Sequence, residues 1–423
     1  MLPLSKPYFD EKESAAVQEV LASGWVTQGP QVQRFEEAFA ALVGANFACA
    51  VSNCTTGLHL ALQAVGVKPG NLVITVSHSY IATANAIRHC NAEPLFVDID
   101  PATYNMCPTS LLQFLETNTQ QRESGLYYTR ASELVPSESP LNVLDKTQPE
   151  FGKIAAVLIV HQIGMPADME RLLPLARQYG LPMVEDAACA IGSEIQFEGQ
   201  WKKIGYPLGD VVCFSFHPRK VLTTGDGGMI TTNHAEYDQQ FRLLRQHGMS
   251  VPDTVRHGAK QVIVESYLTT GYNFRMTDIQ AAVGIEQLRK LPAFTEKRRM
   301  LDRAYREVLQ GLPWVSPPYQ PDWARSNWQS YAVRIDPLAP ISRDELMQRM
   351  LDLGIATKPG IMNAHQEMPY RNSHFELPLS EAAREQVMLL PLFHAMTEED
   401  VHHVGLCLKK ALQTASVSVT AIS

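Results

Sequence analysis

The amino-acid sequence predicts an α/β protein: a mostly parallel, seven-stranded sheet with helices on both faces, followed by a smaller α+β domain. Three observations lead to this prediction. Short apolar segments alternate with helical segments over the first three-fifths of the chain, several apolar segments are hydrophobic at every position, and the alternation stops near residue 277. Strands that are apolar on both faces are typical of parallel sheets buried between helices. Regular alternation of strands and helices indicates such a sheet.

The strands of the large sheet are predicted where the chain is short, apolar and bounded by turn residues. There are seven such segments: 47–51, 72–76, 94–99, 154–160, 182–186, 211–216 and 228–232. Between them, apolar residues recur at intervals of three and four positions, as at Leu58, Ala61 and Leu62, which predicts amphipathic helices. Sheets of this type bind ligands beyond the carboxyl ends of their strands, so functional side chains are expected at that edge.

The second unit begins with a helix signal. Thr277 to Gln280 form a capping box, Pro292 interrupts the helix that follows, and a further helix is predicted to run to about Gly311. Beyond it the sequence predicts one strand and two more helices, at 331–336, at 343–353 and from the capping box at 397–400 onward. We therefore predict a large domain, 1–285, and a small C-terminal domain, 286–423.

Residues 117–152 interrupt the large domain. They are polar and poorly periodic, and they separate two of the predicted strands. A stretch of that length without structure of its own is uncommon inside a compact domain. It is predicted to be a surface insertion, a lid or a partly disordered loop.

Composition excludes several classes of protein. With 423 residues the chain is expected to hold two domains. The net charge of −8 provides no basic surface for nucleic acid or an anionic membrane, and no apolar run approaches the roughly 18–20 residues of a membrane span. Seven scattered cysteines without CxxC spacing indicate reduced thiols, and the histidines show no metal-ligand spacing. The N-terminus does not resemble a signal peptide, so we expect a soluble, cytoplasmic protein without a metal.

Two charged residues follow predicted buried strands. Asp186 ends the strand 182–186 among apolar residues, where an unpaired carboxylate is costly. Lys220 follows the strand 211–216, beside Arg219 and before a glycine-rich turn. Partial burial is expected to lower the pKa of this amine, as carbonyl chemistry requires. A carboxylate that keeps a pyridine nitrogen protonated and a lysine that binds an aldehyde are what pyridoxal phosphate needs. A structural cap or ion pair for Asp186, and a solvated Lys220, are the alternatives.

The phosphate of that cofactor would need a binding site. Thr55 and Thr56 lie where a strand joins a helix, and the free N–H groups and dipole of a helix N-terminus favour an anion. Ser215 is expected to reach the same anion from beside the lysine. Tyr80 follows another strand and is expected to stack on the cofactor ring. A simple helix cap for the threonines and core packing for Tyr80 are the alternatives.

Longer segments of the chain resemble one protein family. They include SGWVTQGPQVQRFEEAFA, VSNCTTGLHLAL and GDVVCFSFHPRKVLTTGDGGMITTN, and all eight lie in the family's order, at 23–40, 51–62, 79–106, 164–193, 209–233, 244–249, 271–288 and 343–355. The family is that of the DegT-type pyridoxal-phosphate enzymes, the nucleotide-sugar aminotransferases. The resemblance runs nearly end to end and implies the aspartate-aminotransferase-like architecture, fold type I.

The resemblance also implies roles for individual residues. Lys220 would be the Schiff-base lysine and general acid/base, and Asp186 would pair with the pyridinium nitrogen. The phosphate ligands and the ring-stacking residue would be Thr55, Thr56, Ser215 and Tyr80. Asn273 resembles the residue that reaches the phosphate of the neighbouring subunit, with Arg275 close by. The resemblance therefore implies an obligate homodimer with composite sites across its interface.

The chain departs from the family pattern at several places. Cys189 stands where Gln or His usually faces the phenolic oxygen of the cofactor, and a thiol is a poorer donor than an amide. The segment HQIG at 161–164 replaces the usual HLYG, and 358–370 departs from the commoner form. Because these last two segments shape the substrate pocket in relatives, Lys358 and His365 are candidates for sugar or phosphate contacts.

The predicted reaction moves an amino group from L-glutamate to a nucleotide-linked keto-sugar, a 3- or 4-keto-6-deoxyhexose, and so makes an amino sugar. A cyclitol ketone is the alternative acceptor. A sugar dehydratase is a second alternative, but its known relatives carry His in place of Lys220. A non-catalytic sensor or scaffold is a third, and it predicts the loss of Asp186 or Lys220, both of which are present.

Overall fold

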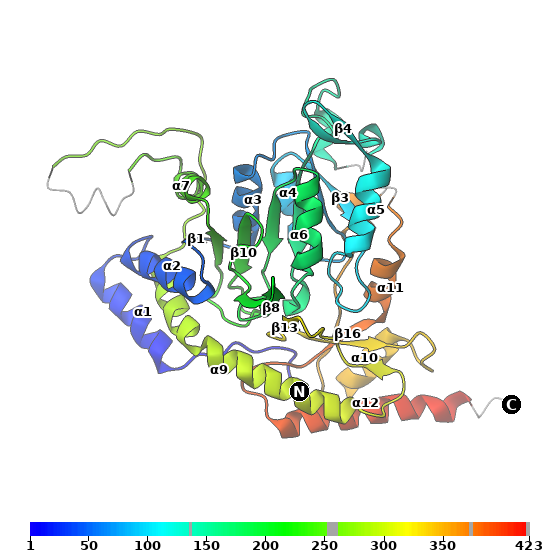
Figure 1. Ribbon diagram of the computed structural model, residues 1–423. Helices are drawn as coiled ribbons and strands as arrows, with labels where there is room; N and C mark the ends of the chain where they lie inside the picture. The colour runs from blue at the N-terminus through cyan, green and yellow to red at the C-terminus, as the bar shows by residue number, and fades with distance from the viewer. Residues whose placement is uncertain (135–137, 252–260, 372–374, 420–423) are drawn as a thin grey trace.

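The large sheet has the predicted number of strands. The computed structural model describes residues 1–134, 138–251, 261–371 and 375–419 (Figure 1). The strands follow the order β1-β11-β10-β7-β6-β2-β3, with the bounds β1 Phe47–Val51, β2 Leu72–Val76, β3 Glu93–Val97, β6 Ile154–Val160, β7 Met183–Asp186, β10 Val211–Ser215 and β11 Gly228–Thr232. Only β11 runs antiparallel to its neighbours β1 and β10. The predicted α/β fold class is confirmed.

Helices cover both faces of this sheet because alternate residues of each strand point to opposite sides. In β1, Ala48 and Ala50 join one core cluster, whereas Cys49 and Val51 join the other. The first cluster contains residues of α2 Pro30–Val43, α5 Pro108–Asn118 and α6 Met169–Gln178. The second contains residues of α3 Cys54–Ala64, α4 Ala82–His89 and α7 Ala235–Leu244. Helix α1, Glu11–Ser23, packs against α9, Asp278–Leu309.

Helix α9 (Asp278–Leu309) is continuous, so the predicted interruption at Pro292 is wrong. Proline costs about 3 kcal/mol inside a helix because it lacks an N–H and clashes with the preceding turn. Burial on both sides of the proline offsets that cost: Leu288 and Leu291 belong to the large core, and Leu301 belongs to a separate cluster. The predicted domain boundary at 285/286 falls inside this helix, and the division at that point stays a prediction.

The separate cluster forms the core of the C-terminal region. Its four-stranded sheet has the order β12-β14-β16-β15, with the bounds Val315–Ser316, Tyr331–Ile335, Val387–Leu390 and Lys358–Pro359. Helices α10 Arg343–Asp352, α11 Pro378–Gln386 and α12 Glu398–Val419 complete it. The sequence indicated only β14, because strands of two to four residues are too short to show a period. A three-stranded sheet, β13 Ala324–Arg325, β8 Glu194–Phe197 and β9 Gln200–Lys203, joins this region to the large one.

The described part of 117–152 contains structure of its own. Strands β4 (Thr119–Arg122) and β5 (Gly125–Tyr128) form an antiparallel hairpin, and 3-10 turns follow at Ala131–Glu133 and Pro140–Val143. The hairpin contacts the chain where β6 begins, through a bridge between Tyr127 and Lys153. It therefore lies at the amino ends of the parallel strands, opposite the edge at which a ligand site is expected.

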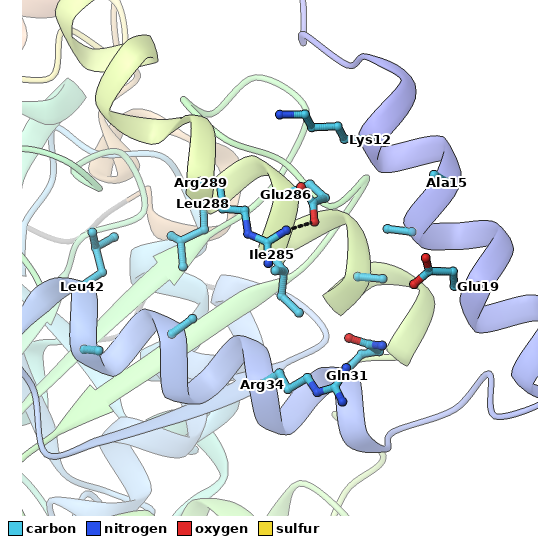
Figure 2. Close-up of a pocket in the computed structure, with 14 residues that line it drawn as sticks. Lys12, Ala15, Glu19, Gln31, Arg34, Leu42, Ile285, Glu286, Leu288 and Arg289 are labelled. Atoms are coloured by element: carbon cyan, nitrogen blue, oxygen red, sulfur yellow. Dashed lines mark hydrogen bonds and ion pairs between the residues drawn. The ribbon is translucent and has the colours of Figure 1, made fainter.

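A groove of about 1040 Å³ lies between α1, α2 and α9 (Figure 2). Its lining combines alanines with a charged rim that includes Lys12, Glu19, Arg34 and Arg289. None of the predicted site residues lines this groove. It is separate from the candidate active site described below.

The start of α2 depends on a carboxylate from α9. Gly29 precedes α2 and has no capping side chain, and Asp278 accepts hydrogen bonds from the backbone N–H groups of Gly29, Gln31 and Val32 at 2.8, 3.0 and 3.0 Å. A negative group at a helix N-terminus satisfies its free donors and its dipole. Asp278 therefore ties two helices of the large core together.

We predict that Asp278→Ala lowers the free energy of unfolding by about 2 kcal/mol, because three backbone N–H donors at the start of α2 lose a charged acceptor. Urea denaturation measures this change. The exposed Asp322 provides a matched control, and Asp322→Ala is expected to change stability by less than about 0.5 kcal/mol. Equal effects of the two substitutions would contradict the capping role.

Candidate active site

Asp186 ends β7 at the carboxyl edge of the sheet and is 5% exposed. Its Oδ2 accepts a hydrogen bond from the Thr83 hydroxyl at 2.8 Å, and its Oδ1 accepts one from the Ala188 N–H at 3.1 Å. Burial raises the pKa of this carboxyl, and Thr83, Ala188 and Lys220 offset part of the rise. Among the described residues it forms no close ion pair, and it caps no helix. The alternatives of a structural cap or ion pair are therefore not what the geometry shows.

Lys220 lies in the turn after β10, beside the strand that ends in Asp186. Its backbone N–H donates to the His217 carbonyl at 2.8 Å, and its Nζ donates to Cys189 Sγ at 3.1 Å. The neighbouring strands β7 and β10 run parallel, with Cys213 paired to Asp186. The structure thus brings Asp186, Cys189 and Lys220 to the same edge of the sheet, as the strand-end argument predicted.

The direction of the pKa shift on Lys220 corrects the expectation from sequence. Burial lowers the pKa of this amine, but the neighbouring Cys189 and Asp186 raise it by more, so it lies above its ordinary value. Nearby acidic groups favour the charged ammonium. The sequence showed that Lys220 would be partly buried, but it did not show that Cys189 would lie within hydrogen-bond distance.

The proposed phosphate end of the site is built around Gly228. In the sheet, Gly228 pairs with both Ser215 and Val51, so the end of β10 lies one strand from the turn that starts α3. A Cβ at position 228 would lie 2.6 Å from the carbonyl carbon of Asn53 and 2.8 Å from the N atom of Cys54. Only glycine lets the first turn of α3 approach this closely.

The cap of α3 is Asn53, not a threonine. Its Oδ1 accepts from the Thr56 N–H at 3.0 Å, and Thr56 Oγ1 donates to the Asn53 carbonyl at 2.8 Å. Within the described part of the chain, the Thr55 hydroxyl has no recorded side-chain hydrogen bond. The alternative of a simple threonine cap therefore does not hold, and Thr55, Thr56 and Ser215 lie together near the N-terminus of α3.

Tyr80 is 63% exposed at the turn before α4, so it does not pack in the core. The Tyr80 carbonyl accepts a hydrogen bond from the N–H of Thr83. Since Thr83 also binds Asp186, the turn that carries Tyr80 is fixed to the strand end of β7. Tyr80 is therefore exposed at the same edge of the sheet as Asp186.

Phe274, which lies between Asn273 and Arg275, contacts the turn before α3. Asn273 is exposed, and it forms a bridge with Gln246. The following carbonyl, that of Phe274, accepts from the Ser52 N–H at 2.8 Å, and the ring of Phe274 stacks on Tyr272 at 4.6 Å. Asn273 is therefore one residue away from a backbone contact with the turn before α3.

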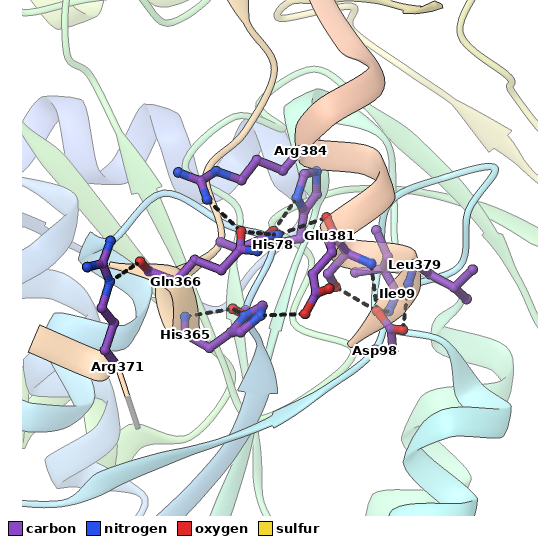
Figure 3. A network of polar contacts seen from close by, with 12 residues as sticks. His78, Asp98, Ile99, His365, Gln366, Arg371, Leu379, Glu381 and Arg384 are labelled. Carbon is purple, nitrogen blue, oxygen red and sulfur yellow. Dashed lines mark hydrogen bonds and ion pairs between the residues drawn. The ribbon is translucent and has the colours of Figure 1, made fainter. Parts of the chain in front are cut away.

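His365 belongs to a polar network that joins the C-terminal region to the end of β2 (Figure 3). Its Nδ1 lies 2.6 Å from Ser77 Oγ, and its Nε2 donates to Glu381 Oε1 at 3.2 Å. Burial lowers the pKa of this imidazole despite the neighbouring carboxylate. Because both ring nitrogens are bonded, His365 holds segments together and presents no free nitrogen to a substrate.

Lys358, in contrast, is exposed on β15. Partial burial of its amine, and then the charge of Arg219, lower the pKa of Lys358. Lys358 therefore lies near Arg219, the residue before Lys220. Among the described residues neither Lys358 nor Arg219 forms a recorded ion pair. Two cations close to Lys220 make this side of the site suited to an anionic group.

Reasoning from the sequence missed two residues that fix the site. Thr83 follows Tyr80 by three positions, a spacing that puts both residues on one side of a helical turn. This spacing was the one sign in the sequence that Thr83 could lie near the site. Asn327 carries no motif: it is fully buried, and its Nδ2 donates to the carbonyls of Cys189 at 2.8 Å and Ile191 at 2.7 Å. Its contacts span more than a hundred positions in the sequence, so they become visible only in the fold.

Comparisons with known proteins identify the family to which the chain belongs. The chain matches the DegT/DnrJ/EryC1/StrS aminotransferase family over residues 7–409. An uncharacterised protein of Methanocaldococcus jannaschii is 32% identical over 415 residues, which cover 97% of each chain. The solved aminotransferase TlmJ of Streptoalloteichus hindustanus is 31% identical, with a TM-score of 0.81, over 98% of this chain and 100% of TlmJ. DesI, solved in the presence of its TDP-sugar product, is 27% identical, with a TM-score of 0.79, over 100% of this chain and 96% of DesI.

The fold and the site define a pyridoxal-phosphate-dependent aminotransferase of fold type I. Within that class, the chain belongs to the DegT/DnrJ/EryC1/StrS aminotransferase family. The resemblance inferred from the sequence segments and the cofactor inferred from the Asp and Lys pair are both confirmed.

Two features are absent from the part of the chain that the structure describes. No helix there has the length and apolar character needed to cross a membrane. No group of three or more His, Cys, Asp or Glu side chains in that part of the chain is arranged to hold a metal ion.

We predict that Gly228→Ala weakens pyridoxal phosphate binding at least about tenfold, because its Cβ would displace the first turn of α3 and its N–H groups. Titration of the purified protein with pyridoxal phosphate, followed by fluorescence, measures the dissociation constant. Gly57→Ala is the control: it lies in α3, and its Cβ would meet only side chains, at 3.4 Å. Unchanged binding by Gly228→Ala would show that this approach of backbones does not form the phosphate site.

Proposed function

We propose that this enzyme transfers an amino group from L-glutamate to a keto-sugar carried on a nucleotide diphosphate, a 3- or 4-keto-6-deoxyhexose. The observation that carries the proposal is the convergence of Asp186 and Lys220 at the ends of two adjacent parallel strands. Membership in the DegT family supports the amino transfer. The presence of a TDP-sugar product in the DesI structure supports a nucleotide-linked acceptor.

The residues present fit pyridoxal phosphate. The backbone approach at Gly228 forms a cradle that a Cβ would fill, and the buried Asp186 still has room on its carboxylate for a further donor. Asp186 would hold the ring nitrogen and Tyr80 would cover one ring face. The phosphate would be held by Thr55, Thr56 and Ser215. When bound, the cofactor supplies an aldehyde that takes up the amino group and a ring that withdraws electrons from the carbon losing its proton.

Lys220 is proposed as the group that moves protons. Its Nζ takes the proton from the α-carbon of glutamate in the first half-reaction and gives a proton to the sugar carbon in the second. The Lys220 amine can accept a proton only in its neutral form. The Lys220 ammonium therefore has to lose a proton before this step. Asp186 would contribute by keeping a proton on the ring nitrogen, because a carboxylate nearby favours the charged form of a basic nitrogen.

Cys189 is proposed to take the place beside the phenolic oxygen of the cofactor. Its Sγ already accepts a hydrogen bond from Lys220 Nζ, so it lies next to the reacting amine. Arg275, Lys358 and His365 are the remaining substrate candidates. Lys358 with Arg219 offers positive charge for the diphosphate, whereas the bonded nitrogens of His365 favour an indirect role through Ser77.

We further propose that the enzyme is a homodimer in which Asn273 reaches the phosphate in the partner's site. The support comes from two observations: Asn273 is exposed, and so are apolar side chains on residues 261–270, which we call the arm. In the arm, Val262, Tyr267 and Leu268 are 94%, 63% and 66% exposed. This arm extends away from the body beside α7 (Figure 1). Exposed apolar patches of this kind indicate interaction surfaces.

The alternatives are weaker. A dehydratase would carry His in place of Lys220, and a scaffold would lack Asp186 or Lys220, so neither is favoured by the residues present. A cyclitol ketone remains the alternative acceptor, and the acceptor experiment below separates it from a nucleotide sugar.

We predict that Lys220→Ala lowers the turnover of glutamate to 2-oxoglutarate by about 1,000-fold or more, because the group that transfers the proton is removed. The change of the cofactor's visible absorbance on adding glutamate measures the first half-reaction directly. Lys68→Ala, at a side chain that is 63% exposed, is the control and is expected to behave as the wild type. Substantial transamination by Lys220→Ala would end the proposal.

The acceptor is identified by a screen. The enzyme, glutamate and pyridoxal phosphate are incubated with nucleotide-linked 3-keto and 4-keto hexoses and, in parallel, with cyclitol ketones. Mass spectrometry is expected to find the exchange of oxygen for an amino group only in a nucleotide-linked sugar. Amination of the cyclitol alone would contradict the proposed acceptor class but would leave the amino transfer intact.

A further inference from the structure

Residues 326–330, which we call the positioning loop, connect the C-terminal region to the active site. Asn327 in this loop is fully buried, and both polar atoms of its side chain form hydrogen bonds. Its Nδ2 donates to the carbonyls of Cys189 and Ile191 at 2.8 and 2.7 Å, and its Oδ1 accepts from the Gln329 N–H at 2.9 Å. Its own N–H donates to Ser193 Oγ at 3.0 Å. Asn327 therefore fixes the turn that follows Asp186.

Gln329 reaches the other half of the site from the same loop. Its Nε2 donates to the Arg219 carbonyl at 2.8 Å, and Arg219 directly precedes Lys220. The loop thus holds two separate backbone carbonyls, those of Cys189 and Arg219. The side chains that come together between these two anchor points are Cys189 Sγ and Lys220 Nζ, which lie 3.1 Å apart.

The positioning loop is itself rigid. Arg298 of α9 is 5% exposed, and its Nη1 donates to the carbonyls of Trp328 and Gln329 at 2.8 and 3.1 Å. Burial lowers the pKa of Arg298 to about 10, so it stays charged at neutral pH and remains a strong donor. Trp328 adopts a φ of +49°, a left-handed conformation that a bulky residue takes only when its surroundings hold it there.

We propose that Asn327 and Gln329 are positioning residues that set the distance and orientation between the Lys220 amine and the Cys189 thiol. This proposal rests on the proposed role of Lys220 in proton transfer. Both side chains act through backbone carbonyls and touch neither reacting group. Reaction rates depend steeply on such alignment, because misplacing a catalytic group by about 1 Å can cost a hundredfold in rate.

The chain offers a matched pair of variants for the test. Gln329→Met keeps the length of the side chain but removes the donor to the Arg219 carbonyl. Gln320 holds the same loop from its outer side, because its Oε1 accepts from the Ser326 N–H at 2.8 Å, and it contacts neither Cys189 nor Arg219. Gln320→Met therefore loosens the loop without breaking its link to the site. Asn327→Ser removes the second link, and thermal unfolding of all variants checks that they are folded.

The first measurement does not need transamination. Full-length protein, before and after addition of pyridoxal phosphate, is treated with iodoacetamide, and peptide mass spectrometry gives the alkylation rate of Cys189 relative to Cys107, the other half-buried cysteine. An ammonium beside a thiol favours the reactive thiolate. Before pyridoxal phosphate is added, Gln329→Met and Asn327→Ser are expected to lower this ratio at least about threefold, and Gln320→Met to leave it unchanged.

The second measurement is kinetic. Gln329→Met is expected to lower kcat for the glutamate half-reaction about tenfold and to change KM less than about twofold, because alignment is lost while binding is not. If Gln320→Met gave the same losses, or if Gln329→Met changed neither the alkylation ratio nor kcat, the positioning role would be overturned. A wild-type protein that does not transaminate would refute the proposed function instead, and the alkylation ratio would still decide the role of the loop.

Discussion

The structure depends on one constraint: a carboxylate and an amine have to be kept out of water, close together, at the end of a sheet. Burying Asp186 costs free energy, so its oxygens are bonded to Thr83 and Ala188, and the amine of Lys220 lies close enough to lower its pKa in part. The parallel pairing of β7 and β10 gives both residues the same edge. The close approach of α3 to Gly228 then places helix N–H groups at the opposite end of the same site.

Much of the fold was predictable, because it depends on local patterns. The seven strands are short, mostly apolar segments bounded by turn residues, and their predicted bounds agree with the structure to within one or two residues. Pro292 was misread because the packing of α9 against two cores outweighs a local penalty that the sequence makes visible. In the site, Asp186 and Lys220 could be found from their places after strands. Thr83 and Asn327 could not be assigned roles, because these depend on hydrogen bonds between residues 103 and 138 positions apart.

Helix α9 accounts for much of the long-range organisation. Near its start Asp278 caps α2, further along Leu288 and Leu291 pack in the large core, and beyond Pro292 Arg298 holds the positioning loop. One helix therefore holds both the start of α2 and the positioning loop, which reaches Cys189 and Arg219. If the loop positions the site as proposed, a substitution of Arg298 would shift Lys220 through the backbone carbonyl of Arg219. No residue of the site itself would need to change.

Asp98, which lies just past β3, connects the large sheet to the C-terminal region. Its carboxylate accepts hydrogen bonds from the N–H groups of Leu379 and Ser380 and from the Ser380 hydroxyl, at the N-terminus of α11 (Figure 3). Together with the contact between Ser77 and His365, this holds the C-terminal region against the ends of β2 and β3. The position of His365 is therefore set by contacts within the fold, on one side to the end of β2 and on the other to α11.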